Sequence, residues 1–263
     1  MASVRNPAVA GLFYPEDPRE LHAMVTDFLG AVPAAGTVPK AIIAPHAGYI
    51  YSGPIAASAY ARLKPARGRI TRVVLLGPAH RVGFHGLALP SANYFMTPLG
   101  RIAVDQEAVK KISLLSHVRV MDAAHAQEHS LEVHLPFLQE ALGEFSLVPL
   151  VVGDAGPEEV GEVLDLLWGG PETLIVISSD LSHYHDYKTA QKLDRATSQA
   201  IEQLRPEDID YDHACGRNPV NGLLHVARRL GLKAKTIDLR NSGDTAGSHD
   251  RVVGYGAYVF ESP

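Results

Sequence analysis

The fold of this chain follows from residues 41–53, which read Ala-Ile-Ile-Ala-Pro-His-Ala-Gly-Tyr-Ile-Tyr-Ser-Gly. The run from Ala41 to Ala44 is apolar and short enough to form a fully buried strand. Pro45 has no N–H to give to a sheet ladder, so the strand ends there. Because His46 follows immediately, the sequence predicts an imidazole at the carboxyl end of a core strand.

The residues after His46 predict the lip of a pocket. Gly48 and Gly53 allow tight backbone turns without a steric penalty. Tyr49 and Tyr51 supply aromatic surface with hydroxyl tips, and we assign both to a substrate pocket.

A buried strand followed by polar side chains occurs twice more in the chain. Residues 72–80 contain an apolar run that ends in His80, and residues 173–177 form another that leads to Asp180 and His183. In α/β sheets, ligands bind beyond the carboxyl ends of the strands. We therefore expect these side chains, although far apart in sequence, to meet at one edge of a sheet.

Strands that alternate with helices predict an α/β fold. We expect a single domain over residues 1–263, in which helices flank both faces of a central mixed, mostly parallel sheet. Residues 1–15 are expected to form an irregular arm that packs on the body, and residues 87–104 an antiparallel excursion. The expected helices span residues 17–29, 54–63, 105–115, 128–142, 157–167, 187–204, 206–214 and 219–230.

Composition narrows the classes of partner. The net charge of -5 and the absence of like-charge runs argue against nucleic acid and against a membrane surface. No apolar stretch approaches the roughly 20 residues that span a bilayer, and the start of the chain lacks the pattern of a signal peptide. The single cysteine, Cys215, permits no internal disulfide. We expect a cytoplasmic protein that binds a small molecule or a peptide, with a homo-oligomer left open.

His46, His80 and Cys215 have the donor types of a metal site, and an open site needs about three protein ligands. Each residue alone also has a structural interpretation, since a strand-end histidine can be a paired core residue and a lone cysteine a small buried hydrophobe. Taken together, the three donors weaken the structural interpretation and favour the metal site. Gly216 and Arg217 flank Cys215 at an expected helix start, where the cation and the helix amides would lower the thiol pKa. We also assign Arg217 to the substrate pocket.

Four further residues are candidates for acid/base catalysis. His129 and Glu132 lie three apart in the expected helix 128–142 and would share one face of it; an exposed helix position is the alternative for Glu132. The two histidines of this motif are five residues apart, whereas the metalloprotease signature has them four apart. Asp180 and His183 form a second pair, in which the carboxylate would orient the imidazole. No Gly-x-Ser-x-Gly elbow is present, which disfavours serine hydrolysis.

Five ordered motifs resemble those of the Memo proteins, known in prokaryotes as the Memo component, or protein B, of the AmmeMemoRadiSam system. The motifs are Pro45-His46-Ala47-Gly48-Tyr49, Gly77-Pro78-Ala79-His80, Glu128-His129-Ser130-Leu131-Glu132-Val133-His134-Leu135-Pro136, Ser178-Ser179-Asp180 with His183, and Cys215-Gly216-Arg217. Two positions depart from the family. Ala79 stands where serine is common and Phe13 where tryptophan can occur, and neither change removes a candidate ligand.

The resemblance implies a fold related to the class III extradiol dioxygenases, which hold non-haem Fe(II) with two histidines and a carboxylate. In Memo-like chains a cysteine takes the place of that carboxylate. Carried over residue by residue, it implies metal ligands at His46, His80 and Cys215, and pocket residues at Asp180, His183 and His129. One mononuclear metal is expected, with Fe(II) first, copper as the alternative, and zinc compatible with the donor types. The resemblance also implies AMMECR1-like or radical SAM partners.

Two classes of function fit these observations. The first is a metal-dependent redox enzyme in which O2 reacts at iron or copper, in one version an extradiol-type dioxygenase acting on a catecholic or related small molecule. The second is a non-catalytic binding or adaptor protein that uses the same pocket for a peptide, a small ligand or a metal. Metal-assisted hydrolysis on Zn(II) is a third alternative, and it would not require O2.

Overall fold

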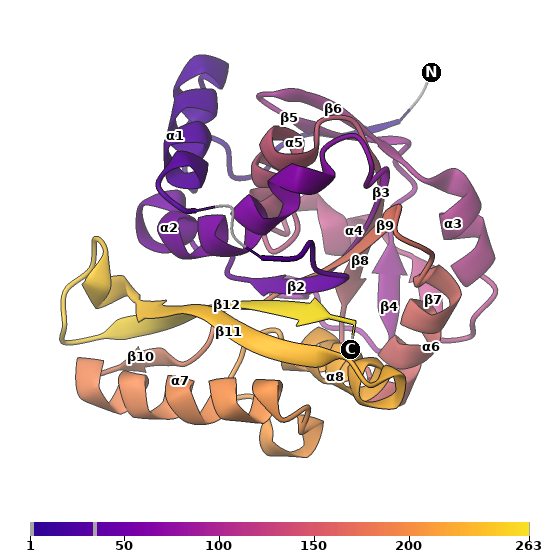
Figure 1. The fold of residues 1–263 in the computed structure, drawn as a ribbon. Helices are drawn as coiled ribbons and strands as arrows, with labels where there is room; N and C mark the ends of the chain where they lie inside the picture. Colours follow the sequence, from indigo (N-terminus) through magenta and orange to yellow (C-terminus); the bar gives the residue numbers. More distant parts are fainter. Residues whose placement is uncertain (1–2, 34–35, 263) are drawn as a thin grey trace.

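The computed structural model describes residues 3–33 and 36–262, so residues 1–2, 34–35 and 263 of the predicted domain lie outside the described part. The strands are β1 (Val4–Arg5), β2 (Ala41–Ala44), β3 (Arg72–Pro78), β4 (Leu87–Leu89), β5 (Tyr94–Thr97), β6 (Gly100–Val104), β7 (Val118–Val120), β8 (Ser146–Val152), β9 (Thr173–Ser178), β10 (His183–His185), β11 (Lys233–Asn241) and β12 (Val252–Glu261). They form a sheet in the order β1-β5-β6-β8-β3-β9-β2-β12-β10, in which β11 pairs with β12, and β4 with β7 and β8 (Figure 1).

The centre of the sheet is parallel. β3 pairs in parallel with β8 and β9, and β2 with β9, whereas β12 runs antiparallel to β2 and β11 antiparallel to β12. The β5–β6 hairpin supplies part of the expected antiparallel excursion. The prediction of a mixed, mostly parallel sheet in an α/β domain is therefore confirmed. Because β2, β9 and β3 are adjacent and parallel, their carboxyl ends open at the same edge.

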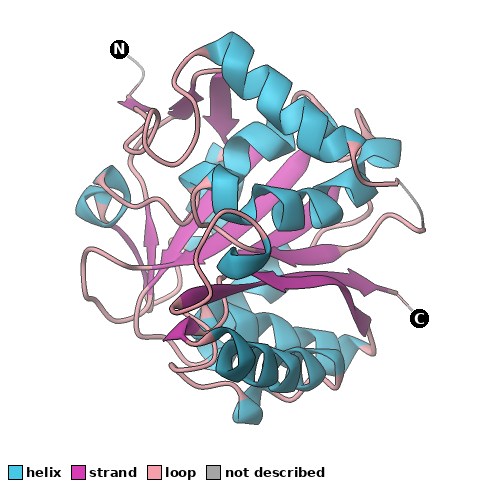
Figure 2. Ribbon diagram, turned by 90° about the vertical axis from the view of Figure 1, so that its left-hand side faces the viewer, coloured by secondary structure: helices cyan, strands magenta, loops and turns pink. Residues whose placement is uncertain are grey.

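Helices cover both faces of the sheet, as Figure 2 shows. The helices are α1 (Pro18–Gly30), α2 (Tyr49–Tyr60), α3 (Gln106–Ile112), α4 (Asp122–Ala126), α5 (Leu135–Leu142), α6 (Pro157–Leu167), α7 (Tyr187–Glu202) and α8 (Arg217–Leu230), with 3-10 turns at Ala61–Ala66, Glu132–His134, Pro206–Asp208 and Ser242–Asp244. Ile42 and Ala44 of β2 pack in one hydrophobic cluster with α1, α2 and α5, whereas Ala41 and Ile43 pack in another with α6, α7 and α8. This division follows from the alternation of side chains along a strand.

Local signals explain where several elements begin. Asp17 caps α1 by accepting hydrogen bonds from the backbone N–H groups of Arg19 and Glu20, and Pro18 occupies the first turn, as the sequence predicts. The strand β2 is fully buried along its length, also as predicted. No helix in residues 3–33 and 36–262 is long and apolar enough to cross a membrane.

Three predicted helices differ in the structure. The helix expected to begin at Pro54 begins earlier, at Tyr49, directly after Gly48, so that Pro54 lies inside the helix. In place of the helix expected over residues 128–142, the chain has a loop, one 3-10 turn and then α5, where Pro136 lies in the first helical turn. Only a 3-10 turn forms within residues 206–214. The second difference matters most, because it changes which side chains of residues 128–134 can reach the sheet edge.

Candidate functional site

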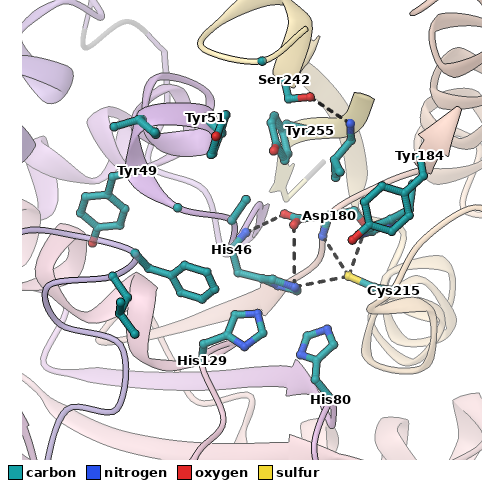
Figure 3. Close-up of a pocket in the computed structure, with 18 of the residues that line it drawn as sticks. His46, Tyr49, Tyr51, His80, His129, Asp180, Tyr184, Cys215, Ser242 and Tyr255 are labelled. Atoms are coloured by element: carbon teal, nitrogen blue, oxygen red, sulfur yellow. Dashed lines mark hydrogen bonds and ion pairs between the residues drawn. The ribbon is translucent and has the colours of Figure 1, made fainter. Parts of the chain in front are cut away.

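The predicted donors meet at the carboxyl edge of the sheet. His46 follows β2 after one proline, His80 follows β3, and Cys215 lies just before α8. One ligand atom from each of these residues lies within 4.8 Å of the other two. Figure 3 shows the two imidazoles and the sulfur facing a common space. The structure thus brings together the three residues that the sequence assigns to a metal site.

Both histidines use the ring nitrogen that points away from this space. His46 Nδ1 lies 2.6 Å from Ser178 Oγ, and His80 Nδ1 lies 2.8 Å from Glu128 Oε1. Each Nε2 is left for the cluster, and His46 Nε2 is 3.4 Å from Cys215 Sγ. A metal-bound histidine characteristically has its second nitrogen engaged in this way. Two imidazoles and a sulfur in this arrangement fit a mononuclear iron, copper or zinc ion.

The environment of Cys215 corrects the predicted thiolate. Burial raises the pKa of the thiol, and the neighbouring Asp180 carboxyl raises it further, although N–H groups of Asp180 and Gly216 counteract part of the effect. Arg217 does not offset the burial, because its guanidinium lies over the ring of Tyr211 at 5.9 Å and is not among the cavity-lining residues. Arg217 thus lies outside the lining of this cavity, and its part in a substrate pocket stays a prediction. A bound cation would favour the thiolate, because metal ligation releases the thiol proton.

Asp180 and His183 both line the cavity but do not form the expected pair. Asp180 Oδ1 accepts the backbone N–H of His46 at 2.7 Å, and His183 Nδ1 is bonded to the carbonyl of Leu181 at 2.7 Å. A backbone carbonyl, not the carboxylate, thus orients His183. Burial raises the pKa of Asp180 to about 7, against the lowering effect of the His46 N–H. Burial lowers the pKa of His183, so this imidazole is neutral at pH 7.

His129 lies in the site, whereas Glu132 does not. The His129 ring stacks on that of His80, with centroids 4.6 Å apart, and burial followed by the charge of His80 lowers its pKa to about 4. Glu132 turns the other way and accepts hydrogen bonds from the backbone of Ala8 and Val9 in the N-terminal arm. Residues 128–131 are not helical, so a spacing of three does not place His129 and Glu132 on one face as predicted, and Glu132 bonds to the arm and does not line the cavity.

A cavity of about 1140 Å³ lies over the cluster and includes both predicted tyrosines in its lining. Tyr51 is 36% exposed, whereas Tyr49 is buried and donates its hydroxyl to the carbonyl of Val133 at 2.6 Å. Tyr49 therefore contributes ring surface, and its polar tip is used within the fold. Tyr255, from β12, closes another side of the cavity near Asp180 (Figure 3).

The mouth of the cavity carries apolar side chains that the sequence did not single out. Leu12, Ile50, Tyr184 and Tyr211 line the cavity and are 82%, 58%, 64% and 75% exposed. Tyr184 has a φ of 63°, a backbone conformation that a bulky residue adopts only at a cost in energy. These residues come from four separate segments with no shared periodicity, so no sequence pattern could have grouped them. Together these four residues form an exposed apolar rim of the cavity, called the rim below.

The sequence predicted no role in the site for Glu128 or Ser178, although both belong to the quoted motifs. Glu128 is buried and accepts from His80 twice, through its backbone N–H at 2.6 Å and its ring at 2.8 Å. Burial alone would raise the pKa of Glu128, but the bonds with His80 outweigh it and lower the pKa to about 2. The available signal was a carboxylate directly before His129 in the quoted motif.

Fold and site together define a class of protein, an α/β domain whose sheet edge carries two histidines and a cysteine suited to one metal ion. The chain matches the family described as Memo-like protein over residues 5–259, and it belongs to this Memo family.

Relatives span nearly the whole chain. The MEMO1 family protein of Aquifex aeolicus (strain VF5) is 38% identical over 98% of this chain and 99% of that protein. The MEMO1 family protein of Ignicoccus hospitalis (strain KIN4/I / DSM 18386 / JCM 14125) is 35% identical over 99% of each. The solved structure of uncharacterized protein JW3007 from Escherichia coli K12 covers 82% of this chain and 98% of its own, with 14% identity and a TM-score of 0.49. The fold assignment rests on the sheet topology of this chain.

Proposed function

We propose that this Memo family protein is a metal-dependent redox protein that holds one iron or copper ion with His46, His80 and Cys215. The observation that carries the proposal is the convergence of these three donors within 4.8 Å at a sheet edge beneath a cavity. A thiolate is a softer ligand than a carboxylate, which favours Fe(II) or copper, while zinc also accepts this donor set. Iron or copper bound there would supply one-electron and O2 chemistry.

The chain's own residues would handle protons and substrate. Asp180, with a pKa near 7, can give or take a proton at neutral pH. His183 is neutral and lines the same cavity, so its Nε2 can accept a proton from a substrate hydroxyl. Tyr51 and Tyr255 would hold a flat apolar ring between them. A catechol or related small molecule satisfies these requirements, and extradiol-type ring opening is the most specific version of the proposal.

The test is oxygen uptake by protein reconstituted without oxygen with Fe(II) or with Cu(I), against a panel of catechols and related phenols. We expect uptake that depends on both metal and substrate, and that falls at least about tenfold in Asp180→Asn because the variant cannot exchange a proton there. Asp105→Asn is the control, since Asp105 caps α3 away from the cavity. No uptake with any metal across the panel would contradict the enzyme proposal.

A second candidate function is a binding protein that uses the cavity for a peptide or small ligand. The exposed rim of Leu12, Ile50, Tyr184 and Tyr211 supports it, because clustered apolar side chains around a cavity mark interaction sites. A His46→Ala variant that loses metal but keeps ligand affinity would favour this function. This second function also includes a cytoplasmic location, homo-oligomers and partners of the AMMECR1-like or radical SAM kind. Copurification tests the ligands and the partners.

Hydrolysis on Zn(II) is distinguished by its independence of O2. Activity of the zinc-loaded protein that persists without oxygen would favour it over redox chemistry.

A further inference from the structure

We propose that the tripeptide Glu128-His129-Ser130 fixes the protons of both His46 and His80 on Nδ1, and that Arg5 positions this tripeptide from the N-terminal arm. The tripeptide is called the orienting tripeptide below. The proposal rests on the proposed function only where it predicts metal affinity, because the position of a ring proton is a property of the metal-free chain.

His46 is oriented through Ser178. Ser178 Oγ lies 2.6 Å from His46 Nδ1 and 2.6 Å from the carbonyl oxygen of Ser130. A carbonyl can only accept, so the single hydroxyl proton of Ser178 goes to Ser130. Ser178 Oγ must then accept from the imidazole. This places the proton of His46 on Nδ1 and its lone pair on Nε2, toward Cys215.

His80 is oriented directly by Glu128. Besides the His80 ring, the carboxylate accepts the backbone N–H groups of His80, His129 and Ser130 at 2.6, 3.0 and 2.9 Å. An ionised carboxylate has no proton to give, so His80 Nδ1 must be the donor. The lone pair of His80 is therefore on Nε2.

The orienting tripeptide packs directly on the end of β3. A Cβ atom at Gly77 would lie 2.8 Å from Ser130 Oγ, so only glycine leaves room there. Ser130 Oγ donates to the carbonyl of Pro78 at 2.8 Å, which ties the tripeptide to the strand that ends at His80. The loop and both histidines are thus held in one frame.

Arg5, in the N-terminal arm, bonds to residues on both sides of the tripeptide. Its guanidinium donates to the carbonyl of His125 at 3.1 Å and to that of Glu128 at 2.7 Å, and it forms an ion pair with Glu132 on the far side of the tripeptide. The rigid fork of arginine suits several acceptors at once, which lysine cannot match. Arg5 is buried, so these bonds are protected from water. Arg5 is therefore a positioning residue for two histidines that it does not touch.

His129 provides an internal reference. Among the described residues its Nδ1 has no hydrogen-bond partner, although the atom is buried. The tripeptide therefore fixes the protons of its neighbours by hydrogen bonds, whereas its own imidazole, whose Nδ1 is 3.5 Å from Glu128 Oε1, makes no such bond and is held less firmly in one tautomer. A general preference of the pocket for one tautomer would act on all three rings alike, whereas the proposal predicts order at two of them only.

The experiment is ¹⁵N NMR of histidine-labelled, metal-free full-length protein at neutral pH, which reports the tautomer of each ring. We expect Nδ1–H at His46 and His80 in the wild type. Ser178→Ala should release His46 alone, and Glu128→Gln should release His80 alone. Arg5→Lys, which keeps the charge but not the fork, should loosen both rings. Ser198→Ala is the control, because this buried hydroxyl bonds to Tyr258 in the cluster that packs with α6, α7 and α8.

A Co(II) titration of the same variants gives the second readout. Glu128→Gln and Ser178→Ala should bind Co(II) about 10- to 100-fold more weakly than the wild type, as is usual when the partner of a metal-bound histidine is removed. Nε2–H at either ring in the wild type, or variants with unchanged tautomers, would overturn the proposal. Ordered tautomers in a wild type that binds no Co(II) would uphold it while contradicting the proposed function.

Discussion

Two polar regions of this molecule, one buried and one that lines the cavity, differ in how their side chains are paired. The first is the arm anchor, formed by Arg5, Tyr14 and Glu132, in which both oxygens of the Glu132 carboxylate accept hydrogen bonds. Arg5 and the backbone N–H of Ala8 meet one oxygen, and the backbone of Val9 and the hydroxyl of Tyr14 meet the other. The donor cluster, formed by His46, His80 and Cys215, instead turns lone pairs toward a shared space.

The difference separates structure from function. Burying a charge is costly unless every bonding position is filled, and the arm anchor meets that condition within the chain. The donor cluster differs, since its sulfur accepts the backbone N–H of Asp180 at 3.3 Å and lies 3.4 Å from His46 Nε2, yet the ligand atoms of its three residues still converge on one space. A region that is complete by itself holds the chain together, and a region that is incomplete in a convergent way is built to receive something. The predictions below test this contrast.

The largest effect is expected from breaking the arm anchor. Arg5→Met leaves the Glu132 carboxylate buried without its cation, which should lower the free energy of unfolding by about 3–5 kcal/mol. Urea denaturation followed by circular dichroism measures the change. The double variant Arg5→Met/Glu132→Gln should recover much of the loss, because no uncompensated charge remains. If both proteins were equally destabilised, the anchor would not act through the pairing of its charges.

Acid should destabilise the fold through buried neutral histidines. Burial lowers the pKa of His125 to about 4 and that of His134 to about 3, whereas an unfolded histidine titrates near 6.5. Between these values the unfolded state binds more protons, so stability is full above pH 6.5 and falls as the pH drops, by on the order of 3 kcal/mol per group at pH 4. His125→Gln keeps a donor for the carbonyl of Ala88 and should flatten the profile. An identical profile in this variant would remove His125 from the explanation.

Tyr49 and Tyr51 show the same contrast between a hydroxyl that is bonded within the fold and a side chain that is open to the cavity. Tyr49→Phe removes a buried bond to the Val133 carbonyl and should cost about 1–3 kcal/mol of stability without changing metal affinity. Tyr51→Phe should leave stability unchanged, because the Tyr51 side chain is partly exposed at the cavity. Thermal unfolding and Co(II) binding of both variants provide the comparison. A larger loss of stability in Tyr51→Phe would reverse the assignment.

The smallest effect on stability is expected at the rim. Tyr211→Ser and Leu12→Ser remove exposed side chains and should change the free energy of unfolding by no more than about 0.5 kcal/mol. Their effect should appear in ligand binding, measured by calorimetry with any catechol that supports oxygen uptake. Unchanged affinity in both variants would show that the rim takes no part in recognition.

Strand-end patterns predicted much of this architecture because they depend on local chemistry. Pro45 ends β2 and places His46 at its tip, and the rule for carboxyl ends of parallel strands correctly joined it with His80. Contacts between residues far apart in sequence could not be predicted from strand-end patterns. Glu128 and Glu132 are the same residue type, four positions apart, and their opposite roles depend on where the arm docks.

Neighbours in sequence were also misleading where the fold separates their side chains. Arg217 is two positions from Cys215, yet it stacks on Tyr211 and leaves the buried thiol with a raised pKa. His183 follows Asp180 closely, yet a carbonyl orients it. Spacing predicts which face a side chain shares only when the type of secondary structure is known, and these segments are loops.

Elemental analysis of protein purified without oxygen, with Cys215→Ser and His46→Ala prepared in parallel, tests the central claim most directly. We expect about one iron or copper ion per chain in the wild type and a large loss of metal in both variants, because an open site of this kind depends on about three protein ligands. Asp105→Asn serves as the folding control, since Asp105 caps α3 away from the cavity. Equal metal content in the wild type and Cys215→Ser would contradict the assignment of the cysteine as a ligand.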